Sequence, residues 1–162
     1  MMNQQRFLAL VETGTSDQIL SGLEALVLET IGAVIFSCST FDLTAGKSRR
    51  FFTNLPDIYP VAGLKDIVRN RWTAQVLDRK QTFVANKLEE IREVFPDHAI
   101  IESLGCGSVI NMPVFLANQF LGTVNILHKP GYYSAARQTR FQQLRPEVML
   151  AFASRKLDLS AD

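Results

Sequence analysis

Amide and hydroxyl side chains alternate with aliphatic residues along residues 105–128, a stretch that predicts two antiparallel β-strands. Asn111 falls on one face of the first strand, and Thr123 and Asn125 fall on one face of the second, because successive side chains of a strand point to opposite sides of a sheet. Buried amides and hydroxyls need hydrogen-bond partners, so this cluster requires a polar ligand, ordered water or the backbone of overlying loops. The pattern points toward binding more than toward catalysis.

The strand predicted within residues 33–41 extends the same polar face. Ser37 and Ser39 share one side of that strand, and Phe36 and Cys38 share the other. Three aromatic residues lie in segments that are expected to cover the polar face, where they form either a pocket wall or plain core. The predicted ligand-binding residues are Ser37, Ser39, Tyr59, Trp72, Phe95, Asn111, Thr123 and Asn125.

Two further groups of residues have open interpretations. Asn54 and Asn86 stand at the ends of two other predicted strands and are either additional pocket residues or turn residues. Lys47, Arg49 and Arg50 form a small basic cluster. On a nearly neutral chain this cluster is interpreted as a solvated edge that discourages strand pairing.

The cysteines and histidines give no pattern for metal or redox chemistry. Cys38 and Cys106 form neither a CxxC pair nor a disulfide framework, and both are expected to be free thiols. His98 and His128 have no Cys, His or carboxylate at metal-ligand spacing. We therefore predict no metal site and no catalytic residue, and the identity of any cofactor stays unknown.

Composition narrows the class of protein. The chain has 162 residues, 47% of them hydrophobic and 20% charged, with a net charge of +1. These values are typical of a globular domain and give no bulk attraction to nucleic acid or to an anionic membrane. No apolar run is long enough for a membrane span, and the N-terminus lacks a secretory signal. A cytoplasmic protein without nucleic-acid or membrane partners is expected.

The order of predicted elements indicates an α+β fold in a single domain over residues 1–162, with a helical extension at 1–14 and a frayed tail at 157–162. Residues 55–71 read as a long loop of the kind that often covers a ligand. Pro146 predicts a break near Arg145 in the last helix. The expected helices are 19–31, 72–80, 88–95, a short one after Asp97, and one from Ser134. The expected strands are 33–41, 49–54, 82–85 and the pair joined by a turn at Ala117 and Asn118.

Nearly the whole chain, roughly residues 17–152, resembles a GAF domain. The residues that carry the resemblance are Ser-Val-Ile-Asn-Met-Pro-Val at 108–114 and Phe-Leu-Gly-Thr-Val-Asn-Ile-Leu-His at 120–128. A PAS domain is the nearest alternative, but the Met112-Pro113 strand and the long helix before the first strand favour GAF. The resemblance implies a central antiparallel sheet with the terminal helices on one face and, on the other, loops and short helices that cover a pocket.

The same resemblance implies a function. GAF domains bind cyclic nucleotides, tetrapyrroles, haem, amino acids or other small molecules, and some only mediate dimerisation, so the fold does not name the ligand. We expect a stand-alone single-GAF protein of bacterial type, without a fused output domain, that binds a small molecule and forms a homodimer. Helices 19–31 and 141–152 are candidates for the dimer contact, with the alternative that their apolar stripes only cover the sheet.

Two alternatives belong to other classes of function. The first is a thiol-dependent redox enzyme similar to the free methionine sulfoxide reductases, which would use Cys106. Residues 70–74 contain no further cysteine, and Val109, Asn125 and Leu127 stand where that family has acidic positions. The second alternative is an interaction module with a filled-in pocket. Neither the chromophore context nor the cyclic-nucleotide pattern of other GAF domains is evident.

Overall fold

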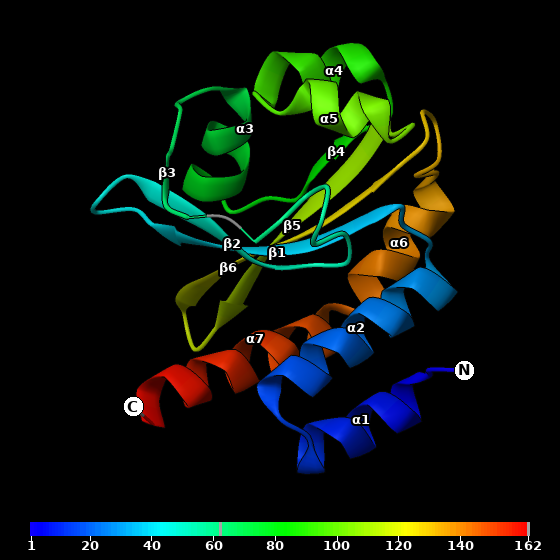
Figure 1. Ribbon diagram of the computed structural model, residues 1–162, viewed down its shortest axis with the longest axis vertical. Coiled ribbons are helices and arrows are strands. Elements are labelled where there is room, and N and C mark those ends of the chain that lie inside the picture. Colours follow the sequence, from blue (N-terminus) through cyan, green and yellow to red (C-terminus); the bar gives the residue numbers. More distant parts are fainter. Residues whose placement is uncertain (62, 162) are drawn as a thin grey trace.

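The structure is a computed structural model that describes residues 1–61 and 63–161. A six-stranded antiparallel sheet in the order β3-β2-β1-β6-β5-β4 divides the molecule into two layers (Figure 1). The strands are β1 (Ile35–Asp42), β2 (Lys47–Thr53), β3 (Lys65–Asp66), β4 (Phe83–Ala85), β5 (Ser108–Leu116) and β6 (Gln119–His128). The expected α+β class with a central antiparallel sheet is confirmed.

Four helices form the layer on one face of the sheet: α1 (Gln4–Thr13), α2 (Ser16–Thr30), α6 (Ala135–Gln143) and α7 (Arg145–Ala161). The stripe of apolar residues on α2 packs with Phe36, Cys38, Val124 and Ile126 from the sheet in one buried cluster. Burial of such side chains contributes roughly 1.5–3 kcal/mol each. This layer forms the main hydrophobic core of the domain.

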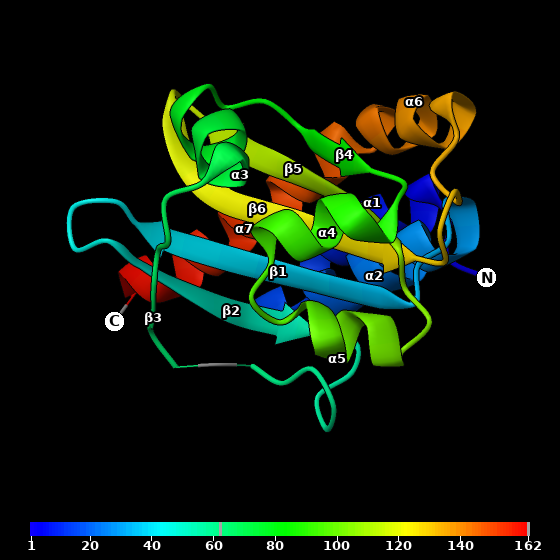
Figure 2. The ribbon, with the colours of Figure 1, turned by 90° about the horizontal axis from the view of Figure 1, so that it is seen from above.

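Short helices and loops form the layer on the other face, as Figure 2 shows from above. They are α3 (Arg71–Thr73), the π-helical turn η1 (Ala74–Asp78), α4 (Leu88–Val94) and α5 (His98–Ser103). A second, smaller apolar cluster lies beneath them and includes Val76, Ile91, Ile101 and Leu127. Because side chains alternate along each strand, the sheet contributes residues to two separate hydrophobic cores. The polar positions lie on the side of the smaller core.

Local signals set the ends of several elements. A capping box between Thr15 and Gln18 begins α2. The turn between β5 and β6 places Ala117 at φ +48° and Asn118 at φ +61°, the left-handed pair that a two-residue hairpin turn requires. Helices α6 and α7 are separated at Leu144, where Pro146 predicted the break.

Three expectations differ from the structure. The segment 55–71 is not wholly loop, because β3 (Lys65–Asp66) pairs with the edge of β2. The helix expected at 72–80 begins at Arg71, becomes π-helical at Ala74 and ends at Asp78. The tail expected to fray from residue 157 is helical to Ala161, and the Ser16 hydroxyl anchors it by donating to Asp158; residue 162 lies outside the described part.

The N-terminal segment 1–14 contains α1, which packs under α2 and α7 (Figure 1). Its one fully buried side chain is Phe7, and the amide of Gln4 donates to Glu147 of α7 at 2.8 Å. Within residues 1–61 and 63–161, no helix combines the length and apolar character needed to cross a lipid bilayer.

Candidate ligand-binding pocket

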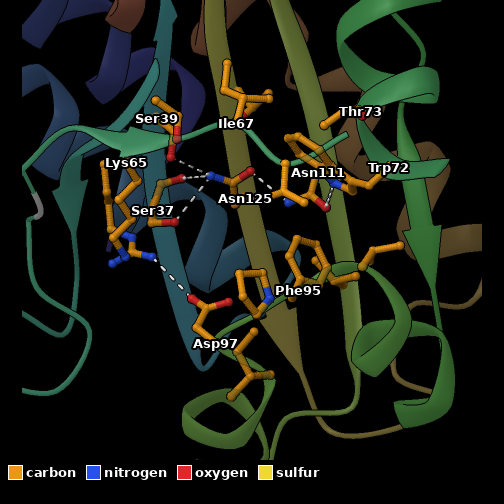
Figure 3. A pocket seen from close by; sticks show the side chains of 18 of the residues that line it. Ser37, Ser39, Lys65, Ile67, Trp72, Thr73, Phe95, Asp97, Asn111 and Asn125 are labelled. Atoms are coloured by element: carbon orange, nitrogen blue, oxygen red, sulfur yellow. Dashed lines mark hydrogen bonds and ion pairs between the residues drawn. The ribbon is translucent and has the colours of Figure 1, made fainter. Parts of the chain in front are cut away.

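A pocket of about 480 Å³ lies between the sheet and the layer of short helices and loops. Its floor is the polar-bearing face of β1, β6 and β5, and its roof is formed by residues from β3, α3 and the turn between α4 and α5 (Figure 3). All eight residues predicted to bind a ligand line this pocket: Ser37, Ser39, Tyr59, Trp72, Phe95, Asn111, Thr123 and Asn125. Their role in binding stays a prediction.

A chain of side-chain hydrogen bonds crosses the floor of the pocket. The indole Nε1 of Trp72 donates to Oδ1 of Asn111 at 2.9 Å, and Nδ2 of Asn111 donates to Oδ1 of Asn125 at 2.7 Å. Nδ2 of Asn125 then faces the hydroxyl oxygens of Ser37 and Ser39 at 3.3 and 3.4 Å. The chain joins α3 to the hairpin of β5 and β6 and, through that hairpin, to β1.

The direction of this chain is set by Trp72. An indole N–H can only donate, so the oxygen of Asn111 must face it. The nitrogen of Asn111 is then turned toward Asn125, whose oxygen must accept, and the nitrogen of Asn125 is left facing the two serines. The serine oxygens accept, and their O–H groups remain available to donate into the pocket.

Thr123 lies on the floor but outside this hydrogen-bonded chain. Its side chain is buried and its Oγ1 has no hydrogen-bond partner within the described residues. Thr123 pairs with Ser39 across the β1–β6 ladder. The residue before it, Gly122, has φ +141°, and a Cβ there would lie 2.0 Å from the Ser39 carbonyl oxygen. Only glycine permits this close approach, which brings Thr123 beside Ser39.

The apolar wall comes from the covering segments. Trp72 packs edge to face with Phe95 at 6.1 Å and lies 6.0 Å from Phe41, measured between ring centroids. Asn70 holds Trp72 in place, because its Oδ1 caps the first turn of α3 while its Nδ2 donates to the Val94 carbonyl. Loop and helix are thus fixed to each other above the floor.

A charged cluster closes one side of the pocket. The guanidinium of Arg50 stacks on Tyr59 at 3.4 Å from the ring centroid, donates to the Pro60 carbonyl at 2.8 Å and lies 3.6 Å from Asp97. The Tyr59 hydroxyl donates to the same carboxylate at 2.8 Å. Burial, and then the negative charge of Asp97, raise the pKa of Tyr59, so its phenol stays protonated at neutral pH.

Arg50 corrects the interpretation of the basic cluster as a solvated edge. Its side chain is only 12% exposed, and it lines the pocket, whereas its neighbour Arg49 points to the opposite side of β2. Arg50 faces the pocket because it is paired with Ser39 on the adjacent strand. The irregular register between Cys38 and Ser39 made that pairing invisible to sequence spacing.

Asn54 and Asn86 are structural residues. Asn54 accepts from the Phe36 amide and donates to the Val34 carbonyl, which ties β2 to the start of β1. Asn86 bonds both the amide and the carbonyl of Tyr133 and so holds the segment before α6. Neither residue lines the pocket.

The two thiols lie on opposite faces of the sheet. Cys38 belongs to the main core and Cys106 to the smaller one. Burial raises the pKa of the Cys106 thiol to about 11 and raises that of Cys38 as well. Thiolate chemistry needs the opposite shift.

The described part of the chain contains no cluster of three or more His, Cys, Asp or Glu side chains able to hold a metal ion. His128 stacks on Tyr132 at 3.5 Å between ring centroids, away from the pocket. Burial, and then the charges of Lys129 and Arg137, lower the pKa of His128.

Comparison with solved structures identifies the fold. The GAF domain of a phosphoenolpyruvate-protein phosphotransferase from Acinetobacter superposes with a TM-score of 0.70 at 11% identity, covering 96% of this chain and 94% of that one. The phycocyanobilin-bound GAF domain of a cyanobacterial phytochrome gives 0.67 at 14% identity, covering 98% of both chains. Free methionine-R-sulfoxide reductase from Neisseria meningitidis, in complex with its substrate, gives 0.63 at 11% identity, covering 95% of this chain and 88% of that one.

No protein-family model and no curated protein matches the chain. The solved structures nevertheless agree over nearly its full length, and the expected resemblance is confirmed at the level of the fold. The chain has the GAF fold. At these identities the likeness does not transfer a ligand or an activity.

Proposed function

We propose that this chain is a sensory or regulatory GAF domain that binds a small organic molecule in the pocket above β1, β6 and β5. The observation that carries the proposal is the pocket itself, about 480 Å³ in volume, with a hydrogen-bonded polar floor and an aromatic wall. Ligand sites commonly have volumes of roughly 300–1,000 Å³ and combine apolar walls with a few placed polar groups.

The unpartnered hydroxyl of Thr123 supports the same proposal. A buried hydroxyl without a partner costs roughly 1–3 kcal/mol, and most native proteins avoid that cost. A bound molecule that accepts a hydrogen bond from Thr123 would remove it. Proteins of the same fold with a bound phycocyanobilin or a bound substrate are consistent with a ligand at this type of domain.

The two alternative functions have less support. A redox enzyme that uses Cys106 needs an accessible, acidic thiol beside a second one, and this thiol is buried, has a raised pKa and lies on the other side of the sheet from Cys38. A filled-in interaction module requires side chains to occlude the face that bears Asn111 and Asn125. That face lines an open pocket.

Native mass spectrometry of protein purified from its host tests the proposal. We expect a reproducible small-molecule adduct that is lost when Asn111 and Asn125 are both replaced by leucine. Gln5→Leu is the matched control, because this amide is exposed on α1, in the helical layer. Circular dichroism establishes that the double variant is folded, and Ser39→Ala gives a milder change in the same pocket.

The outcomes separate clearly. An adduct retained by Gln5→Leu and lost from the pocket variants supports ligand binding. An adduct that all variants retain contradicts the proposed site. A protein that carries no molecule, and whose Trp72 emission is unaffected by small-molecule extracts of the host, contradicts the proposed function and favours an interaction module; Trp72 is the only tryptophan of the chain.

A further inference from the structure

We infer that the ligand carries an anionic oxygen group, a carboxylate or a phosphate, which binds beside Arg50, Lys65 and the hydroxyls of β1 and β6, while an apolar body lies against Trp72 and Phe95. The inference rests on the proposed function and specifies the chemical class of the ligand. It follows from three independent features of the pocket: the direction of its hydrogen bonds, its charge balance and the separation of its polar and apolar sides.

The hydrogen bonds leave donors, not acceptors, at one end of the floor. Because Trp72 fixes the orientation of both amides, the oxygens of Ser37 and Ser39 face the nitrogen of Asn125 and their hydrogens are free. The hydroxyl of Thr123, opposite Ser39 on the neighbouring strand, is also without a partner in the described residues. Three adjacent O–H donors suit a group with several acceptor oxygens.

The charges at the same end favour a negative group. Arg50 is paired with Ser39 on the adjacent strand and is held rigidly by Tyr59 and the Pro60 carbonyl. Its guanidinium has five N–H donors arranged to match carboxylate or phosphate oxygens. The nearest carboxylate is that of Asp97. Its distance of 3.6 Å from the guanidinium is longer than that of a strong charge-assisted hydrogen bond.

The carboxylates that line the pocket are already engaged. Asp66 pairs with Lys47 at 2.6 Å, and Asp97 accepts from Tyr59 and faces Arg50. Lys65, in contrast, lines the pocket without an ion pair among residues 1–61 and 63–161. The charge that remains uncompensated at the pocket is therefore positive.

The apolar groups gather away from this donor end. Figure 3 shows Ser37, Ser39 and Lys65 on the left of the pocket and Trp72 on the right, with the two asparagines between them and Phe95 below Asn111. The aromatic side offers ring faces and edges, and its one polar group, the indole N–H, is already bonded to Asn111. A molecule with an acidic end and a flat apolar body satisfies both sides.

Matched probes test the inference on the purified protein. Phenylacetate, phenyl phosphate, phenylacetamide and 2-phenylethylamine share one ring and differ in the charge of the polar end. Binding is measured by Trp72 emission and by calorimetry. We expect one or both acids to bind at least about tenfold more tightly than the amide, since hydrogen bonds to ionised groups are roughly twice as strong as neutral ones. The tighter acid shows which anionic group the site prefers.

Charge-removing variants locate the effect. Lys65→Gln and Arg50→Gln should each reduce the ratio of acid affinity to amide affinity. We expect a several-fold reduction for Lys65→Gln and a reduction of up to about tenfold for Arg50→Gln. Arg49→Gln is the matched control, because it removes the same charge from the next residue of β2 on the opposite side. We expect it to change the preference less than about twofold. The Lys65 side chain is exposed and forms no ion pair within the described residues, so this variant tests charge without disturbing the fold.

Several results overturn the inference. They are equal binding of acid and amide, tighter binding of the amine, an unchanged preference in both Lys65→Gln and Arg50→Gln, or binding by none of the four probes. Recovery of a natural adduct without an acidic group also overturns it but leaves the proposed function intact. The absence of both an adduct and a probe response contradicts both proposals.

Discussion

At the scale of single residues, Asn111 and Asn125 show how a polar face is kept inside a small domain. Each amide uses its oxygen and its nitrogen within the chain from Trp72 to the serines, so neither atom is left without a hydrogen-bond partner. Thr123, two residues before Asn125 on the same strand, takes no part in this chain, and its hydroxyl has no hydrogen-bond partner in the described residues. Stability and binding therefore make different demands on neighbouring positions of the same strand.

Replacing Thr123 by valine should separate these demands. Valine has a similar volume and lacks the unpartnered hydroxyl, so we expect the free energy of unfolding of the free protein to rise by about 1 kcal/mol. We expect ligand affinity to fall, because a donor is lost. Urea denaturation followed by Trp72 emission measures the stability.

Thr73→Val is the control for this prediction. Thr73 is equally buried, but its hydroxyl donates to the Asn70 carbonyl and accepts from the Asn70 amide, both at 2.9 Å. Its loss should lower the free energy of unfolding by roughly 1–3 kcal/mol. A destabilised Thr123→Val would show that its hydroxyl is satisfied in solution and would remove one support for the ligand.

At the scale of elements, the hairpin of β5 and β6 supplies half of the polar floor, and its turn sets the register of both strands. The register pairs Asn111 with Asn125, which is the pairing that lets the two amides bond. A slip by one residue would turn one of the two amides to the opposite, helical face and separate it from the other. The turn at Ala117 and Asn118 is therefore part of what positions the pocket.

Ala117→Gly should stabilise the domain. Ala117 has φ +48°, a conformation that costs an L-residue roughly 1–2 kcal/mol and that glycine adopts freely. After the entropic cost of glycine, we expect a gain of about 0.5 kcal/mol in the free energy of unfolding. Ala117→Val should be destabilising, because a β-branched residue fits this conformation poorly. Thermal unfolding followed by circular dichroism measures both, and a Gly variant less stable than the valine variant would contradict the argument.

At the scale of the whole molecule, the sheet separates a helical core from the pocket. The sequence suggested the apolar stripes of α2 and of the last two helices as a dimer contact. In the structure these stripes are buried against the sheet within one chain. A homodimer stays a prediction, and it must use outward-facing residues. Leu150 and Leu157 are candidates, because they share one face of α7 and are 37% and 72% exposed.

We predict that replacing both Leu150 and Leu157 by glutamate shifts the protein from dimer to monomer in sedimentation velocity. Charges on an apolar contact face must be desolvated, which opposes association. Leu43→Glu serves as the control, because Leu43 is 53% exposed in the turn between β1 and β2. A wild-type protein that is monomeric at micromolar concentration would contradict the prediction.

The sequence by itself determined the architecture and the floor of the pocket. Alternation along a strand has a fixed period of two, so the parity of Ser37, Ser39, Asn111, Thr123 and Asn125 could be read without coordinates. Glycine, proline and capping residues act locally, and for that reason the hairpin turn and the break before α7 were predictable.

Only the tertiary structure decided how the floor is satisfied and which charges face it. The bond from Trp72 to Asn111 spans 39 positions in sequence, and the contact between Arg50 and Asp97 joins a strand to a distant turn. The role of Arg50 depended on a local irregularity in the pairing of β1 with β2, which skips Phe51 and places Arg50 opposite Ser39. Contacts between distant segments depend on the packing of whole elements, and periodicity along the chain carries no information about which of them meet.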